Sequence, residues 1–156
     1  MLFRTHFVFG IFIGFLLLLV GIFNYNFSEK ILFLVFVLLG TIIVDIDSRK
    51  SVVGRFFLFR PLQWSVSHRG IFHTLIFSIL ISSLIFVINS IAGWGFFVGY
   101  VGHLFLDMLT KRGVKLFWPL FKFKIGFGIK SGGLVEEVLF VLLLLADIWL
   151  FVVVVF

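Results

Sequence analysis

Histidines and carboxylates are the residues of this sequence whose types and spacing could do chemistry. Each histidine lies near an acidic residue or another histidine, at the edge of an apolar segment. The four histidines are His6, His68, His73 and His103. The carboxylates grouped with them are Asp45, Asp47, Asp107, Glu136 and Glu137. Imidazole and carboxylate donors together suit a divalent metal ion, and zinc or manganese is the ion we expect. The chain has no cysteine, so any metal here must use nitrogen and oxygen ligands.

The remainder of the chain is strongly apolar. It is 62% hydrophobic and 13% charged, it holds 25 phenylalanines, and its mean hydropathy is +1.29. These values exclude an ordinary soluble domain. Apolar runs long enough to cross about 30 Å of hydrocarbon occur at roughly 7–23, 31–47, 71–91, 93–109 and 134–156. The sequence therefore predicts an all-α, polytopic integral membrane bundle of about five transmembrane helices, forming a single domain over residues 1–156.

The basic residues predict the orientation of this bundle. Twelve of the thirteen lysines and arginines fall at the N-terminus or in the loops at about 48–70 and 111–133, and Lys30 is the exception. The positive-inside rule then places the N-terminus and both loops in the cytoplasm. Five crossings place the C-terminus outside, so we expect a multi-pass protein of the cell membrane. The net charge of +6 indicates attraction to anionic membrane lipid, and no nucleic-acid partner is expected.

The second loop carries a period-2 pattern. Residues 121–130 alternate apolar side chains with lysine or glycine over most of their length. This pattern predicts an extended segment with one apolar and one basic face. A solvated connector with snorkelling lysines is the alternative.

This topology brings the ionisable residues to one side of the membrane. His103 and Asp107 are four apart and share a helix face. Asp45 and Asp47 end a helix, where the negative end of the dipole disfavours acids and thus favours a nearby cation. His68 and His73 are five apart, so both can serve one site only if the next helix starts between them or just after them. Three histidines and three aspartates at one depth could hold one or two divalent ions.

Each member of the cluster also has a structural interpretation. His103 and Asp107 could be a hydrogen-bonded pair that joins helices. The two aspartates Asp45 and Asp47 could form a solvated helix end, and His6 could be an interfacial histidine. The convergence of all of them is a stronger indication of a metal site than any single residue.

Four blocks of the sequence carry a resemblance to a known family. THFVFGIFIG, IIVDID, SHRGIFHT and GYVGHLFLDMLTKRGVKLFWP resemble successive blocks of the YdjM/YbcI-like membrane-bound metal-dependent hydrolases, over residues 5–136. The most specific parts are His-Arg-Gly-x-x-His and Gly-His-x-x-x-Asp-x-x-Thr-x-x-Gly. Two departures are Val44, where a proline usually stands, and Thr74, where serine is common; neither removes a ligand. The resemblance implies that the metal-binding positions are His6, Asp45, Asp47, His68, His73, His103 and Asp107.

These observations predict a metal-dependent hydrolase that acts at the cytoplasmic membrane face on a phosphoester or ester of a lipid. A lipid substrate is expected because a site between helices at a membrane face meets lipid first. In this hypothesis a metal-activated water is the nucleophile. Arg69 would hold an anionic group of the substrate, and Glu136 would be a general base or a partner of the ligands.

A second hypothesis is a non-enzymatic membrane protein that binds an ion for transport or assembly. Asp147 lies eleven residues beyond Glu136, about 16 Å deeper along a helix. An aspartate at mid-membrane depth is a candidate proton or ion relay. The alternative for Asp147 is a protonated side chain that is hydrogen-bonded to Ser78, Ser82 or Ser83.

Overall fold

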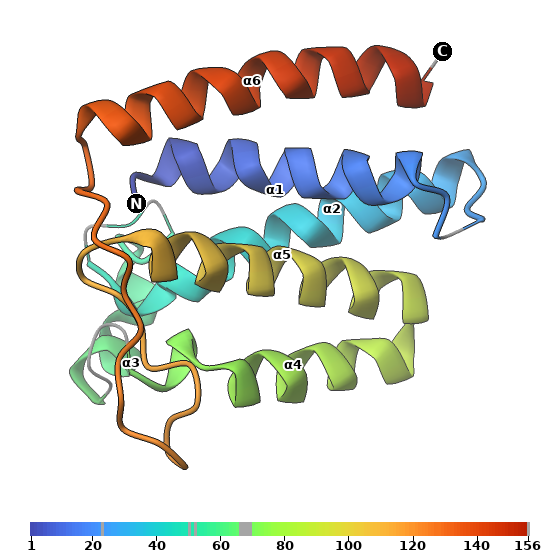
Figure 1. The fold of residues 1–156 in the computed structure, drawn as a ribbon. Coiled ribbons are helices and arrows are strands. Elements are labelled where there is room, and N and C mark those ends of the chain that lie inside the picture. The colour runs from blue at the N-terminus through green and yellow to red at the C-terminus, as the bar shows by residue number, and fades with distance from the viewer. Residues whose placement is uncertain (23, 50, 52, 66–69, 156) are drawn as a thin grey trace.

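The protein is a bundle of five long helices (Figure 1). The computed structural model describes residues 1–22, 24–49, 51, 53–65 and 70–155. The long helices are α1 (Phe3–Leu19), α2 (Phe27–Ile43), α4 (Leu75–Ile88), α5 (Ser90–Leu109) and α6 (Leu134–Val155). The short ones are η1 (Val44–Asp47), η2 (Phe57–Phe59), α3 (Arg60–Ser65) and η3 (Ile71–His73). The prediction of an all-α membrane bundle with about five helices is confirmed.

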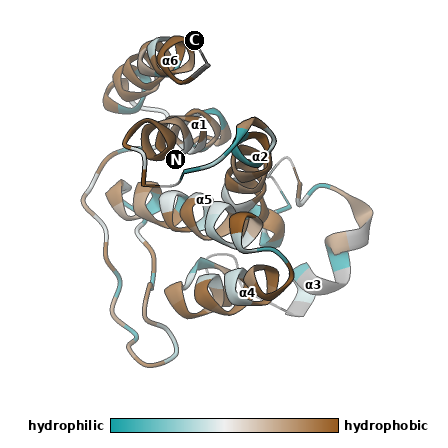
Figure 2. Ribbon diagram, turned by 90° about the vertical axis from the view of Figure 1, so that its right-hand side faces the viewer, coloured by the Kyte–Doolittle hydropathy of each residue, from teal (hydrophilic) through white to brown (hydrophobic). Residues whose placement is uncertain are grey.

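The long helices have the apolar composition of membrane helices. Three helical segments, Phe27–Asp47, Ser90–Leu109 and Leu134–Val154, are long and apolar enough to cross a bilayer. The apolar helices α1 and α4 are shorter. Hydrophobic residues dominate the long helices (Figure 2). The outer side chains of α6, among them Leu142, Leu145 and Trp149, are exposed, as expected for a surface that faces lipid.

Several helix boundaries differ from the predicted ones, because capping residues and tertiary contacts set them. α1 begins at Phe3 rather than near residue 7, so His6 lies inside the helix. α4 begins at Leu75, where the Thr74 side chain accepts a hydrogen bond from the Phe77 amide. Asn89 separates α4 from α5 and caps α5 by accepting from the Ala92 amide at 2.9 Å.

Glycines allow α2 and α5 to pack at very close range. A Cβ atom on Gly99 would lie 1.8 Å from the carbonyl oxygen of Val37, and one on Gly40 would lie 2.2 Å from that of Phe96. Small residues permit such backbone contact between membrane helices. The Thr41 hydroxyl contributes by donating across to the Gly99 carbonyl of α5 at 3.3 Å, as well as to the Val37 carbonyl of its own helix at 2.9 Å. The end of α2 is therefore held directly against α5.

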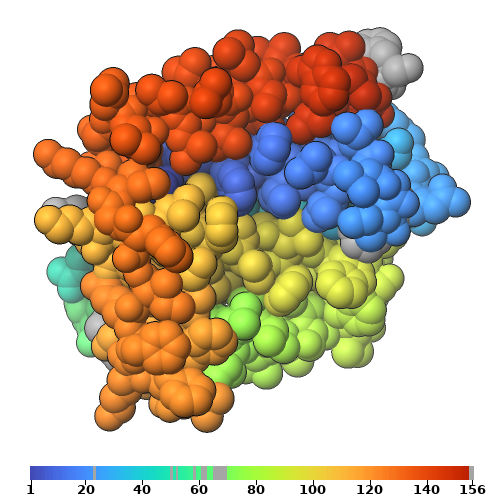
Figure 3. Space-filling view, in the orientation of Figure 1, coloured from blue at the N-terminus to red at the C-terminus, as the bar shows by residue number. Residues whose placement is uncertain are grey.

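The loop between α5 and α6 returns to the end of α5. The amides of Phe127 and Ile129 donate to the carbonyls of Met108 and Leu109, both at 2.9 Å. These bonds satisfy carbonyls that the end of a helix leaves without a partner. Val114 and Ile125 form an antiparallel bridge within the loop. The segment is extended, as the alternating pattern predicts, and it lies over the ends of α5 and α4 (Figure 3, orange).

The chain topology gathers the polar residues at one end of the bundle. α1 and α6 begin at this end, α2 and α5 finish there, and α4 starts there (Figure 1, left). α6 finishes at the opposite end. The candidate site is built where these helix ends meet.

Candidate metal centre

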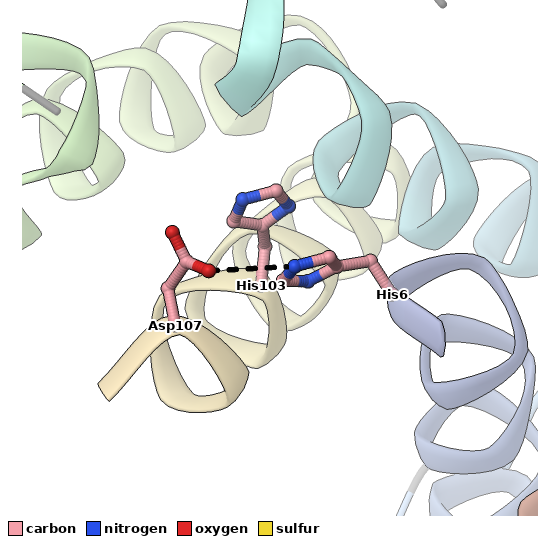
Figure 4. Close-up of side chains that lie close together, drawn as sticks. All are labelled: His6, His103 and Asp107. Atoms are coloured by element: carbon pink, nitrogen blue, oxygen red, sulfur yellow. Dashed lines mark ion pairs between the residues drawn. The ribbon is translucent and has the colours of Figure 1, made fainter. Parts of the chain in front are cut away.

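Five of the seven predicted ligands converge at the polar end of the bundle. They come from four elements: His6 from α1, Asp45 from η1, His73 from η3, and His103 and Asp107 from α5. Figure 4 shows His103 and Asp107 projecting from one side of α5 toward His6. We call these five residues the His–Asp cluster.

The donor atoms of the His–Asp cluster form two sets that share His103. One set is His6, His103 and Asp107, the other is Asp45, His73 and His103, and in each set one donor atom per residue lies within 4.8 Å of the others. His6 Nε2 is 3.5 Å from Asp107 Oδ1, and His73 Nε2 is 3.5 Å from Asp45 Oδ1. His73 Nε2 is 3.7 Å from Asp107 Oδ2, and His103 Nε2 is 3.8 Å from Asp45 Oδ1. Metal–ligand bonds of ~2.0–2.2 Å put tetrahedral ligands roughly 3.3–3.6 Å apart, which is close to these separations.

The orientation of the His103 ring is set by a backbone carbonyl. His103 Nδ1 lies 2.8 Å from the carbonyl oxygen of Thr41. Because a carbonyl can only accept, Nδ1 carries the hydrogen, and the lone pair of the neutral ring is on Nε2. Nε2 is buried and has no hydrogen-bond partner within the described ranges. Metal-binding histidines commonly donate their second ring hydrogen in this way, so Nε2 is prepared to be a ligand.

His73 has a carboxylate on each side of its ring. Nε2 faces Asp45, while Nδ1 lies 3.5 Å from Asp47 Oδ2. Burial opposes the charged imidazolium, but the neighbouring carboxylates of Asp45 and Asp47 outweigh it and raise the pKa of His73 to about 9. Asp47 therefore contacts the ring nitrogen that points away from the shared donors. Of the predicted ligands, it is placed to orient His73 rather than to bind the same ion.

His6 joins the cluster by stacking. Its ring lies 3.9 Å from that of His103 between centroids, at an interplanar angle of 14°. Asp107 lies next to His6, and its Oδ1 also accepts a hydrogen bond from the amino group of Met1 at 2.9 Å. The Thr110 hydroxyl donates to the Asp107 carbonyl at 2.8 Å and ends α5 at this point.

A cavity of about 550 Å³ opens beside the cluster. Three members of the cluster line it: His6, Asp45 and Asp107. Asp45 is the most accessible of these, with 24% of its side chain exposed, whereas His6 and Asp107 are each 3% exposed. A small ligand can therefore reach Asp45 from outside the bundle.

The other predicted site residues lie elsewhere. His68 and Arg69 fall outside the described residues. Glu136 is fully buried and accepts hydrogen bonds from the Leu2 amide at 2.6 Å, the Gly132 amide at 2.7 Å and the Thr5 hydroxyl at 2.8 Å. It thus joins the start of α1 to the start of α6. Glu137, its neighbour, pairs with Arg4 at the surface.

Asp147 does not form the hydrogen bonds to serine that were expected of it if its role is purely structural. It is buried, and neither carboxylate oxygen has a hydrogen-bond partner within the described part of the chain. Ser78 and Ser82 lie on α4, which is on the other side of α5 from α1 and α6 (Figures 1 and 2). Their hydroxyls also lack partners in the described chain. The expectation of a hydrogen bond between Asp147 and these serines is therefore wrong.

Sequence reasoning missed two features that position the cluster. One is the contact of the Thr41 carbonyl with His103. The sequence does not indicate this contact, because every residue has a backbone carbonyl. The other is the close packing of α2 on α5, in which Gly40 lies against Phe96, and Gly95 and Gly99 lie against the backbone of α2. The Gly-x-x-x-Gly spacing at Gly95 and Gly99 in an apolar segment was the available signal for this packing.

The fold and the cluster together define a polytopic membrane protein with a buried group of potential metal ligands at one end. The chain belongs to the YdjM inner membrane protein family, whose family model matches residues 1–155. The resemblance inferred from the sequence blocks is thus confirmed.

Relatives with known names are moderately similar. The chain is 28% identical to inner membrane protein YdjM of Escherichia coli (strain K12) over 127 residues, covering 72% of this chain and 63% of that protein. It is 30% identical to uncharacterized protein YvsG of Bacillus subtilis (strain 168) over 118 residues, covering 72% of this chain and 73% of that protein. The chain thus spans less than two thirds of the Escherichia coli relative. No solved structure matches it.

Proposed function

We propose that the protein is a metal-dependent hydrolase that acts at the cytoplasmic membrane face on a phosphoester or ester of a lipid. The observation that carries this proposal is the His–Asp cluster, in which His103 Nε2 is buried, oriented and without a hydrogen-bond partner in the described chain, beside an open cavity. Leaving the lone pair of this buried ring nitrogen without a partner would cost on the order of a few kcal/mol. A bound cation would supply that partner.

The residues of the cluster fit a divalent ion, with zinc or manganese preferred by their donors. His73, His103, Asp45 and Asp107 would be ligands. His6, whose Nε2 lies beside Asp107, would complete the set. His103 offers Nε2 alone, since Nδ1 is bonded to Thr41, so it can bind only one ion. When bound, the metal would supply a water with a pKa near ~7 and polarise the oxygens of the substrate.

The chain's own residues supply access and orientation. Asp45 lines the cavity and is partly exposed, so it is placed to accept a hydrogen bond from an incoming water or substrate. The role of Glu136 as a general base stays a prediction; its three hydrogen bonds favour a positioning role. The role of Arg69 in holding an anionic group also stays a prediction.

The surroundings of the cavity favour a lipid substrate. Leu2 and Phe3 line it together with the polar cluster residues, and both are exposed apolar side chains. A molecule with a polar head and an apolar tail matches this combination. The assignment to the cytoplasmic face rests on the distribution of basic residues.

Elemental analysis of the purified protein tests the proposal. We expect bound zinc or manganese in the wild type, and loss of both the metal and lipid ester or phosphoester hydrolysis in His103→Ala. Asp147→Asn is the control, and it should retain both because Asp147 lies about three helical turns along α6 from Glu136, away from the polar end of the bundle. Metal-free wild-type protein, prepared without chelators, would contradict the proposal.

One observation favours the competing function, an ion-binding protein for transport or assembly. Asp147 is buried with no hydrogen-bond partner in the part of the chain that the structure describes, which is unusual for a carboxylate within an apolar helix. The two functions predict opposite sensitivities. If Asp147→Asn stops ion uptake into vesicles and no ester is cleaved by the wild type, the transport function replaces the hydrolase.

A further inference from the structure

We infer that the cavity beside the His–Asp cluster binds the phosphate group of a phosphomonoester, and that Lys111, Arg112 and Lys130 hold it. This inference rests on the proposed function and deepens it, because it selects an anionic phosphoester over a neutral ester. Three basic residues line the same cavity as the cluster: Lys111, Arg112 and Lys130. We call them the basic rim.

Backbone pairing brings the basic rim together. The Lys111 amide donates to the Ile129 carbonyl at 2.9 Å, and Thr110 and Ile129 form a parallel bridge. Lys111 and Lys130 are far apart in sequence, yet they follow directly on these two paired residues. The pairing also fixes the rim to the end of α5, which carries Asp107. The rim and the cluster are thus parts of one rigid framework.

The charges of the basic rim are not neutralised by nearby acids. The exposed base Arg4 pairs with Glu137. Lys111, Arg112 and Lys130, in contrast, have no ion pair with a carboxylate within the residues that the structure describes, which include every acidic residue of the chain. Three cations beside a cavity favour an anionic ligand, and guanidinium and ammonium groups are common phosphate ligands. A neutral ester would make no use of them.

Asp45 and Asp107 line the same cavity and would repel an anion unless their charges are neutralised; the amino group of Met1 pairs with Asp107, and a metal held by the cluster would neutralise both carboxylates. Phosphate binding should therefore depend on the metal as well as on the rim. The basic rim would hold the phosphate group, and a metal held by the His–Asp cluster would supply further positive charge to the same cavity. The cavity volume of about 550 Å³ lies within the usual range of small-molecule sites.

The same loop provides matched controls. Lys122 and Lys124 are also exposed lysines between α5 and α6, but they do not line the cavity. If the basic residues serve only topology and lipid attraction, the two pairs of lysines should be equivalent. If the rim is a phosphate site, only Lys111 and Lys130 should matter.

Titration calorimetry with inorganic phosphate tests the inference on protein purified in neutral detergent and loaded with zinc or manganese. We expect Lys111→Gln/Lys130→Gln and Arg112→Gln each to weaken phosphate binding about tenfold or more, with metal content and Tm unchanged. Lys122→Gln/Lys124→Gln should bind like the wild type. Chelator treatment should abolish phosphate binding in every variant.

Two substrates separate the sources of the phosphate group. Vesicles that contain phosphatidic acid present it on a lipid, and glycerol phosphate presents it in solution. Rim-dependent release of inorganic phosphate from vesicles alone identifies a lipid phosphomonoester, and release from both identifies phosphomonoesters in general. Both results support the inference.

The failures of the two proposals are distinguishable. Equal phosphate affinity in the rim and control variants, or no phosphate binding by the loaded wild type, overturns the phosphate site. Hydrolysis of a neutral lipid ester that is insensitive to the rim variants also overturns it, but leaves the hydrolase standing. Rim-dependent phosphate binding with no bond cleaved in any lipid keeps the site and removes the hydrolase.

Discussion

Single side chains determine which donors of the cluster are available. His103 and His73 each use one ring nitrogen for orientation, on Thr41 and Asp47, and present the other to the cluster. The sequence predicted the ligand types and their shared depth, because histidine and aspartate at the ends of apolar segments are few. It did not separate Asp45 from Asp47, since only the observed 3₁₀ turn of η1 turns one toward the shared donors and the other behind His73.

At this scale we predict that Asp47→Asn weakens metal binding but does not abolish it. Removing a charged partner behind a metal-binding histidine typically costs about 10–100-fold in affinity. Asp45→Asn should cost more, because it alters a ligand. Competition with a chelator of known affinity measures both. Equal losses in the two variants would contradict the distinction between ligand and orienting residue.

Contacts between helices hold the ligands in register. The long apolar runs predicted the helices, whereas the start of α1 depends on Glu136, more than a hundred residues away in sequence. A contact between residues so far apart in the chain leaves no pattern in the local sequence. For the same reason the predicted start near residue 7 was wrong, although the existence of the helix was predicted correctly.

Glu136→Gln should destabilise the protein, because an amide cannot accept all the hydrogen bonds that this carboxylate accepts. The loss of a buried bond to a charged group is typically worth about 1.5–3 kcal/mol, which thermal unfolding in detergent would detect. Glu137→Gln is the matched control, since its pair with Arg4 is exposed and should contribute little. Lost turnover at unchanged Tm would instead support Glu136 as a general base.

Gly99→Ala should separate α2 from α5. The added methyl group would overlap the Val37 carbonyl, and overpacking of this kind costs typically about 1–3 kcal/mol. We expect a lower Tm together with weaker metal binding, because the Thr41 carbonyl moves away from His103. Gly102→Ala is the control on the same helix, since its nearest contact is the side chain of Phe9 at 3.3 Å. Unchanged metal affinity in Gly99→Ala would show that the helix contact does not position the site.

The whole molecule is asymmetric along the bundle axis. The cluster, the basic rim and the loop between α5 and α6 share one end, and the connection between α1 and α2 lies at the other (Figure 1). The grouping of polar ends could be predicted because successive membrane helices must alternate in direction. The position of the cavity could not be predicted, since its walls combine residues 1–3, η1 with the residues that follow it, and the distant loop between α5 and α6.

The distribution of basic residues predicts that the polar end faces the cytoplasm. The cysteine-free chain permits single replacements at the exposed positions Asn24 and Lys122. An impermeant thiol reagent added to intact cells should label Asn24→Cys, whereas Lys122→Cys should be labelled only after the membrane is opened. The reverse pattern would place the centre outside.

The bond network of Glu136 also has a consequence for biogenesis. His6 emerges from the ribosome first, but the segment that bears it is held by the first turn of the last helix. Chains are synthesised from the N-terminus and tend to fold in that order. A nascent chain that ends before α6 therefore holds His73, His103 and two aspartates with His6 still untethered. The centre closes only after the final helix has entered the membrane, so metal loading on the cell's timescale should follow translation rather than accompany it.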